Sequence, residues 1–102
     1  MENRLKINVP NEKFVDFCKK NHIRKLSFFG SVLTNRFRSD SDVDVLVEFE
    51  EGKGPGFFEL SGMEIELSEF LSRRVDLRTP NELSRYFRDQ VMAAAQVQYD
   101  RG

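Results

Sequence analysis

Asp42 and Asp44 stand at the beginning of an apolar run that is rich in β-branched residues and ends at Phe49. This composition predicts a strand over Asp42–Phe49, near the middle of a sheet. Because successive side chains of a strand point to opposite faces, both carboxylates lie on one face, with α-carbons roughly 6 to 7 Å apart. Carboxylates at that spacing repel each other, and a hard divalent cation offsets the repulsion. Oxygen ligands favour Mg²⁺ or Mn²⁺ over zinc.

Asp76 is a third carboxylate in a similar setting, between Val75 and Leu77 in a predicted strand over Arg74–Arg78. If the two strands are neighbours in one sheet, three carboxylates meet on one face. Two metal ions roughly 3.5 to 4 Å apart would then stabilise the attacking and leaving oxygens of a phosphoryl displacement. The third carboxylate would help to activate the attacking hydroxyl. The pattern therefore indicates metal-dependent chemistry on a phosphate ester.

Gly30 and Ser31 follow a third predicted strand, over Ile23–Phe29. Backbone amides and a hydroxyl at a strand-to-helix turn form a site for anionic β- and γ-phosphates. Glycine matters there because a side chain would keep the phosphates away from the backbone. Each feature also has an ordinary interpretation when taken alone. A Gly-Ser pair is most often a turn, an Asp-x-Asp pair is more often a solvated strand entry or a helix cap, and Asp76 alone would be an exposed strand residue.

A calcium-binding EF-hand loop is the competing interpretation of the same aspartates. Asp40, Asp42 and Asp44 match its positions 1, 3 and 5, and Glu51 matches position 12. Val45 then occupies the position that requires glycine. The apolar residues 45–47 also demand a strand where the loop should coil, so we set this interpretation aside.

Helices are predicted to flank these strands. Residues at positions i, i+3, i+4 and i+7 give one narrow buried stripe from an Asn11 cap, namely Phe14, Phe17, Cys18 and Asn21. After the Gly-Ser turn, Val32, Leu33 and Phe37 could line a brief helix. A second long helix runs through Arg73, with Gly62 inside it, on the repeat of Leu60, Met63, Leu67, Phe70 and Leu71.

The last helix is predicted to start at residues 79–82, Thr-Pro-Asn-Glu, which combine a capping residue, an early proline and a glutamate at the third helical position. It would run to about Tyr99, with one buried face formed by Leu83, Phe87, Val91 and Ala94. Glu50–Gly56 is expected to be a mobile loop. Leu5–Val9 alternates before Pro10 and is expected to be a short edge strand or an extended lead-in.

Length and charge bound the function. The chain has 102 residues, and we expect a single domain over 1–102. Its formal net charge is -1, so no overall field draws it to nucleic acid, and we expect no direct nucleic-acid binding. Cys18 is the only cysteine, which excludes an internal disulfide and a cysteine zinc cage. No apolar run approaches the ~20 residues needed to span a bilayer, so we expect a cytoplasmic protein without a membrane partner.

These motifs together resemble the DNA polymerase β-like nucleotidyltransferase superfamily, and more closely its minimal nucleotidyltransferases. The resemblance rests on Phe29-Gly30-Ser31, on Asp42-Val43-Asp44 eleven residues after the serine, and on Val75-Asp76-Leu77. It implies an α+β fold, a small mixed sheet with helices on one face and the active site on the other. It implies that Gly30 and Ser31 contact the triphosphate of ATP. Asp42 and Asp44 would hold metal, and Asp76 would complete the triad and assist deprotonation of the acceptor.

The same resemblance implies a protein partner, a helical HEPN-domain toxin encoded beside the antitoxin. The expected reaction is transfer of AMP from ATP to a hydroxyl of that partner, with Mg²⁺ or Mn²⁺ as cofactor. Two alternatives stay open: an antitoxin that only masks its toxin, and nucleotidyl transfer to a small molecule or an RNA end. Neither the nucleotide preference nor the oligomeric state follows from the sequence, and homodimerisation is possible.

A few residues remain outside this scheme. His22, the sole histidine, is expected to have a structural or exposed role. Arg36 and Arg38 could neutralise triphosphate or touch an acceptor, although solvated loop arginines are the simpler interpretation. Most of the ten phenylalanines are assigned to the core. Phe57 and Phe58 stand beside the glycine-rich loop and could meet the base or a partner.

Overall fold

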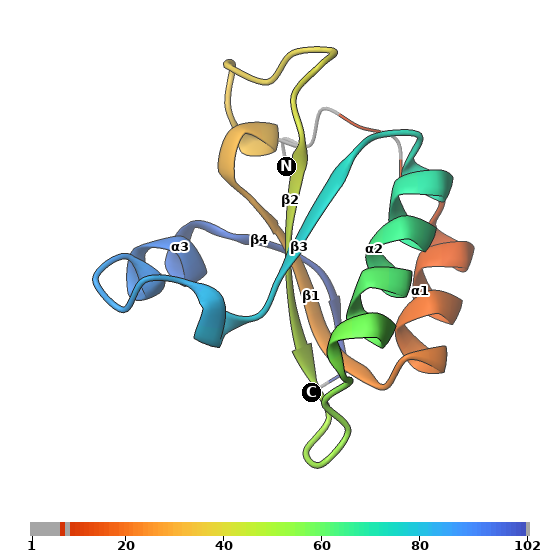
Figure 1. The fold of residues 1–102 in the computed structure, drawn as a ribbon. Helices are drawn as coiled ribbons and strands as arrows, with labels where there is room; N and C mark the ends of the chain where they lie inside the picture. The colour runs from red at the N-terminus through yellow and green to blue at the C-terminus, as the bar shows by residue number, and fades with distance from the viewer. Residues whose placement is uncertain (1–6, 8, 102) are drawn as a thin grey trace.

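A four-stranded mixed sheet organises the residues that the computed structural model describes, 7 and 9–101. The strand order is β3-β2-β1-β4, which makes β2 a central strand as predicted. β1 runs antiparallel to both of its neighbours, whereas β2 and β3 run parallel. Helices α1 and α2 lie side by side on one side of the sheet, and α3 lies on the other (Figure 1). The elements are α1 (Asn11–Lys20), β1 (Ile23–Phe29), the 3₁₀ helix η1 (Gly30–Leu33), β2 (Val43–Phe49), α2 (Phe57–Leu71), β3 (Val75–Arg78), the 3₁₀ helix η2 (Pro80–Glu82), α3 (Arg88–Ala94) and β4 (Gln96–Asp100).

The core fills the space between the sheet and the pair α1 and α2. Alternate residues of β2, Val43, Val45 and Val47, are fully buried there. Phe70 of α2 meets the rings of Phe14 and Phe17 of α1 edge to face, at centroid distances of 5.9 and 5.6 Å. This packing confirms the expected α+β class, with the two long helices on one face.

The predicted stripe on α1 is confirmed except at Asn21, which is the partly buried C-cap, and the predicted N-cap is wrong. Phe14, Phe17 and Cys18 are buried as expected. Pro10, not Asn11, is the N-cap, and Asn11 is the first helical residue. The side chain of Asn11 instead accepts a hydrogen bond from Gln98 Nε2 at 3.3 Å. A contact with β4 has therefore replaced the local capping bond. The expected lead-in over Leu5–Val9 falls largely outside the described residues.

The loop over residues 50–56 is confirmed, and α2 begins directly after it at Phe57. Glu59 closes the start of this helix by accepting a hydrogen bond from the Gly56 amide at 2.8 Å. The helix ends at Leu71, two residues before the predicted Arg73, because Ser72 takes a left-handed conformation with φ 56°. α2 thus returns the chain to the sheet, where β3 pairs beside β2.

The predicted final helix is wrong over most of its length. Its capping contact forms, since the Thr79 amide donates to Glu82 Oε1 at 2.9 Å, but the helix that starts there is only η2. After α3 the chain forms β4 and pairs antiparallel with β1, for example at Ser27↔Val97. Phe87, expected in the core, is 60% exposed. The free edge of β1, a distant partner, decides the structure of this segment.

Candidate active site

Asp44 and Asp76 occupy the same rung of the parallel ladder between β2 and β3. The neighbouring rungs pair Val43 with Val75 and Val45 with Leu77, and all four of these side chains are buried under the helices. Because side chains alternate along a strand, the two aspartates point to the opposite face. The sheet therefore brings them together from segments that are separated in sequence by the whole of α2.

Asp42 lies two residues before Asp44, just outside the strand, and its side chain is 48% exposed. Its Oδ1 atom is 4.0 Å from Arg74 Nε. The pKa of Asp44 shows that the three carboxylates interact electrostatically. Burial raises the pKa of Asp44 above its ordinary value of 3.8, and the charges of Asp76 and then Asp42 raise it further, while Arg78 opposes them. The three carboxylates thus form one acidic cluster.

Gly30 touches this cluster directly. Phe29 pairs with Asp44 across the β1–β2 ladder, and Gly30 follows with φ +77°. A β-carbon at Gly30 would lie only 2.3 Å from Asp44 Oδ2. Glycine is therefore required twice, for its left-handed backbone and for the close approach of that carboxylate. This contact joins the predicted phosphate turn to the predicted metal strand.

Ser31 continues the turn into η1, whose buried Val32 fixes it to the core. The carbonyl of Ser31 accepts hydrogen bonds from the amide and the hydroxyl of Thr34, each at 2.9 Å. Phe37 lies beyond this helix, which ends at Leu33. The turn is thus held by its own backbone and by the core.

A cavity of about 550 Å³ opens beside the turn, between η1 and α3. Gly30 and Ser31 form one wall, and Gln90 and Val91 of α3 form another. The full lining is Phe29, Gly30, Ser31, Leu33, Thr34, Arg36, Gln90, Val91 and Ala94. Val91 and Ala94 had been assigned to a core face by their spacing, so the sequence analysis missed this role. The alternation of residues 96–99, which marks the strand that follows, was the available signal.

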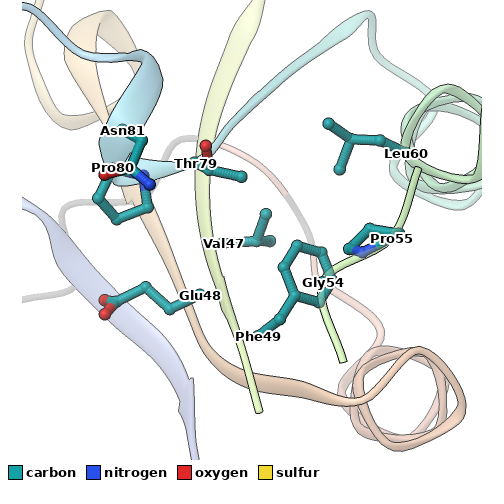
Figure 2. Close-up of a pocket in the computed structure, with 9 residues that line it drawn as sticks. All are labelled: Val47, Glu48, Phe49, Gly54, Pro55, Leu60, Thr79, Pro80 and Asn81. Carbon is teal, nitrogen blue, oxygen red and sulfur yellow. The ribbon is translucent and has the colours of Figure 1, made fainter. Parts of the chain in front are cut away.

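A second pocket, of about 380 Å³, lies away from the acidic cluster at the far end of β2. The last pair between β2 and β3 is Leu46 with Arg78, so β2 has no β3 residue beside it from Val47 onward. The pocket forms beside this unpaired part of β2. Figure 2 shows Val47 and Phe49 directed toward Pro55 and Leu60, with Glu48 pointing the other way. No aspartate lines it, so this pocket is separate from the acidic cluster.

Arg78 neutralises part of the acidic cluster. Its Nε and Nη2 atoms donate to the two carboxylate oxygens of Asp76 at 3.1 and 3.2 Å. Within residues 7 and 9–101, no group of three or more His, Cys, Asp and Glu side chains is arranged as it stands to hold a metal ion. The strands fix the backbone of Asp44 and Asp76, and Arg78 would compete with a shared cation for the oxygens of Asp76. An oxygen-only donor set with mutual repulsion is suited to a hard divalent cation.

The remaining candidates lie outside the cluster. His22 is exposed and 3.9 Å from Glu50, which fits its expected structural role. Arg36 lines the cavity beside the turn, and Arg38 lies in the loop before Asp42. Phe57 and Phe58 are 77% and 87% exposed on α2. None of the helices in the described part of the chain is long and apolar enough to cross a membrane.

The chain has recognisable relatives. A family model described as a nucleotidyltransferase domain matches residues 11–97. A Methanocaldococcus jannaschii protein with the provisional name protein adenylyltransferase is 33% identical over 91 residues, which cover 89% of this chain and 96% of that protein. The chain belongs to the nucleotidyltransferase domain family.

Two solved structures are similar in fold to this nucleotidyltransferase. One, described provisionally as a minimal nucleotidyltransferase, is 32% identical, with a TM-score of 0.69 over 83% of this chain and 85% of that chain. The other is a complex of a tri-AMPylated Shewanella oneidensis HEPN toxin with its MNT antitoxin. It has a TM-score of 0.64 at 18% identity and covers 88% of this chain and 69% of that chain. This second likeness shows a shared fold, that of the minimal nucleotidyltransferases.

Proposed function

We propose that this nucleotidyltransferase transfers AMP from ATP to a hydroxyl of a partner protein, and that the partner is a HEPN-domain toxin. The observation that carries the proposal is the shared rung of Asp44 and Asp76 with Gly30 against Asp44. The relative from Methanocaldococcus jannaschii supports protein adenylyl transfer through its name. The AMPylated HEPN toxin bound to a protein of the same fold supports the choice of partner.

The acidic cluster is the proposed metal site, with Asp42, Asp44 and Asp76 as ligands for Mg²⁺ or Mn²⁺. Burial and the charges of Asp76 and Asp42 raise the pKa of Asp44, so its anion is destabilised, and a bound cation would relieve this repulsion. When bound, such ions stabilise negative charge on the attacking and leaving oxygens of the displacement. Arg78 would compete with the ions for the oxygens of Asp76.

The Gly30-Ser31 turn is the proposed site of the β- and γ-phosphates. The glycine leaves the backbone open to anionic oxygens, and the serine adds a hydroxyl donor. The adjoining cavity of about 550 Å³ would take the nucleoside, since it has the apolar walls and few polar groups of a base pocket. Gln90 is placed there to donate to or accept from a base edge.

The transfer step follows from these positions. The acceptor oxygen attacks the α-phosphorus of ATP, a new P–O bond forms, and the bond to the β-phosphate oxygen breaks. Asp76 takes the proton of the acceptor hydroxyl, and pyrophosphate leaves on the side of Gly30 and Ser31. The products are the adenylylated acceptor and pyrophosphate.

The test uses ATP labelled at its α-phosphate, Mg²⁺ and a HEPN-domain protein as the acceptor. We expect label on the HEPN protein, and its loss with Asp42→Asn and with Asp44→Asn. Label that persists in both variants would defeat the proposed site. If variants that no longer transfer label neutralise the toxin as well as wild type does, the masking alternative is supported. Label on an RNA end or on a free aminoglycoside would support another acceptor.

A further inference from the structure

Arg73 lies between α2 and β3, and its guanidinium holds the loop that precedes Asp42. Nη2 of Arg73 donates to the carbonyl of Arg38 at 2.6 Å and to the carbonyl of Ser41 at 2.8 Å. The same guanidinium stands 4.3 Å from the ring centroid of Phe37, which packs against the core. One side chain thus fastens the two ends of a short turn and rests on a third residue of the same loop.

The turn from Arg38 to Ser41 also closes on itself. The Ser41 amide donates to the Arg38 carbonyl at 3.1 Å, and the Arg38 amide donates to Ser41 Oγ at 2.9 Å. These bonds make the turn compact, but they do not attach it to the rest of the protein. Arg73 supplies that attachment through the two carbonyl oxygens.

Asp42 depends on this attachment more than the other aspartates do. Asp44 and Asp76 are held by a rung of the sheet, whereas β2 begins only at Val43. The side chain of Asp42 is half exposed, and its Oδ1 atom lies as far as 4.0 Å from Arg74 Nε. The residue directly before Asp42 is Ser41, whose carbonyl Arg73 binds.

We propose that Arg73 is the positioning residue for Asp42: it fixes the turn at Arg38–Ser41 so that the Asp42 carboxylate stays beside that of Asp44. The inference rests on the proposed metal site and extends it to a residue that touches neither metal nor nucleotide. Loss of the guanidinium is expected to weaken metal binding about tenfold or more, the range found when a residue that orients a ligand is removed.

The experiment compares wild type, Arg73→Met, Arg73→Lys and the control Arg85→Met. Arg85 is a matched residue, an exposed arginine 5.4 Å from the ring of Tyr86 and outside the proposed site. Direct Mn²⁺ titration without nucleotide gives the metal affinity, and urea unfolding gives the stability of each variant. Limited trypsin digestion reports the loop itself, because Arg36 and Arg38 offer cleavage points there.

Arg73→Met should bind Mn²⁺ about tenfold more weakly and be cleaved faster after Arg38, while Arg85→Met matches wild type. Arg73→Lys should recover part of both, since an ammonium can still donate to the two carbonyls but stacks poorly on Phe37. If Arg73→Met does not fold, the comparison with wild type uses Arg73→Lys. Mn²⁺ affinity equal to wild type in Arg73→Met, or in Arg73→Lys where Arg73→Met does not fold, would overturn the inference alone. No Mn²⁺ binding by wild type would overturn the proposed metal site as well, and with it this role of Arg73.

Discussion

The two faces of β2 carry opposite chemistry within a few residues. Val43, Val45 and Val47 are fully buried beneath α1 and α2. Asp44, on the other face, is only partly buried and adjoins two other carboxylates and the Gly30 turn. Packing on one face places the backbone, and the backbone then places unfavourable charges on the other. Residues on the first face should therefore govern stability, and residues on the second should govern transfer, sometimes at a cost in stability.

Asp44→Asn should give the largest change. Replacing the central carboxylate should lower adenylyl transfer by at least about 100-fold, because a direct ligand matters more than the residues that orient it. The protein should remain folded, since the side chain is not part of the helix-covered core. Labelled transfer and urea unfolding check the two halves of this prediction. A folded variant with more than a tenth of wild-type activity would contradict it.

Gly30→Ala should lower both the stability of the protein and the rate of transfer. The new methyl group would lie 2.3 Å from Asp44 Oδ2, on a backbone with φ +77°. We expect a loss of about 1–3 kcal/mol in unfolding free energy, together with weak transfer.

Two other glycines separate the causes. Gly52→Ala imposes the same backbone strain, at φ +75°, with no atom within 4 Å of the new β-carbon. Gly62→Ala meets neither obstacle and should stabilise α2 by about 0.5–1 kcal/mol. Both control variants should transfer normally. Equal effects of Gly30→Ala and Gly52→Ala on transfer would show that contact with Asp44 is unimportant.

Val45→Ala tests the packed face. Removing buried methyl groups should lower the unfolding free energy by about 1–3 kcal/mol, while transfer per folded molecule stays the same. Cys18 offers the readout, because burial raises the pKa of its thiol to about 12 and keeps it unreactive in the folded state. Its labelling rate should rise in Val45→Ala and should not rise in Asp44→Asn.

Arg78→Gln should increase the affinity of the acidic cluster for metal. The variant frees both oxygens of Asp76, which Arg78 now holds. An exposed ion pair of this kind contributes up to about 1 kcal/mol, so Mn²⁺ affinity should rise by about two- to fivefold. Calorimetric titration measures this change. Weaker binding would mean that Arg78 assists the site instead of competing for Asp76.

The pH dependence of stability gives the smallest expected signal. The pKa of Asp44 is raised above 3.8 in the folded state, so its contribution to stability is fully present below 3.8 and is lost as pH rises through the folded pKa. Asp44→Asn should therefore be more stable than wild type at pH 7, and the two should converge below pH 3.8. Urea unfolding across this range tests the sign. Val45→Ala should show an almost constant difference from wild type instead.

The sequence predicted the region from Ile23 to Arg78 well, because local and tertiary preferences agree there. β1 has the predicted bounds, and β2 differs only at Asp42, which precedes the strand. The choice of Asp42, Asp44, Asp76 and Gly30 followed from strand alternation and turn chemistry, and the structure places them together. The roles of these residues and of Ser31 in binding metal and nucleotide stay predictions.

The region after Thr79 could not be predicted from local signals. The capping contact between Thr79 and Glu82 forms, but capping chemistry sets where a helix starts and carries no information about its length. Leu83, Phe87 and Val91 have helical spacing, yet η2 has already ended before Phe87. Pairing with the free edge of β1, some seventy residues away, then fixes β4. The only local sign of this strand is the short alternation of residues 96–99. The cavity beside Gly30, which depends on α3, was missed for the same reason.

The rung shared by residues 44 and 76 also protects the catalyst against misassembly. A slip of one position between β2 and β3 would turn every side chain of the moved strand to the other side, which would bury carboxylates and expose valines. Such a molecule could not keep its hydrophobic core, so it would unfold and would not persist as a folded but inactive protein. For this enzyme, a folded chain is therefore a chain with Asp44 and Asp76 in register.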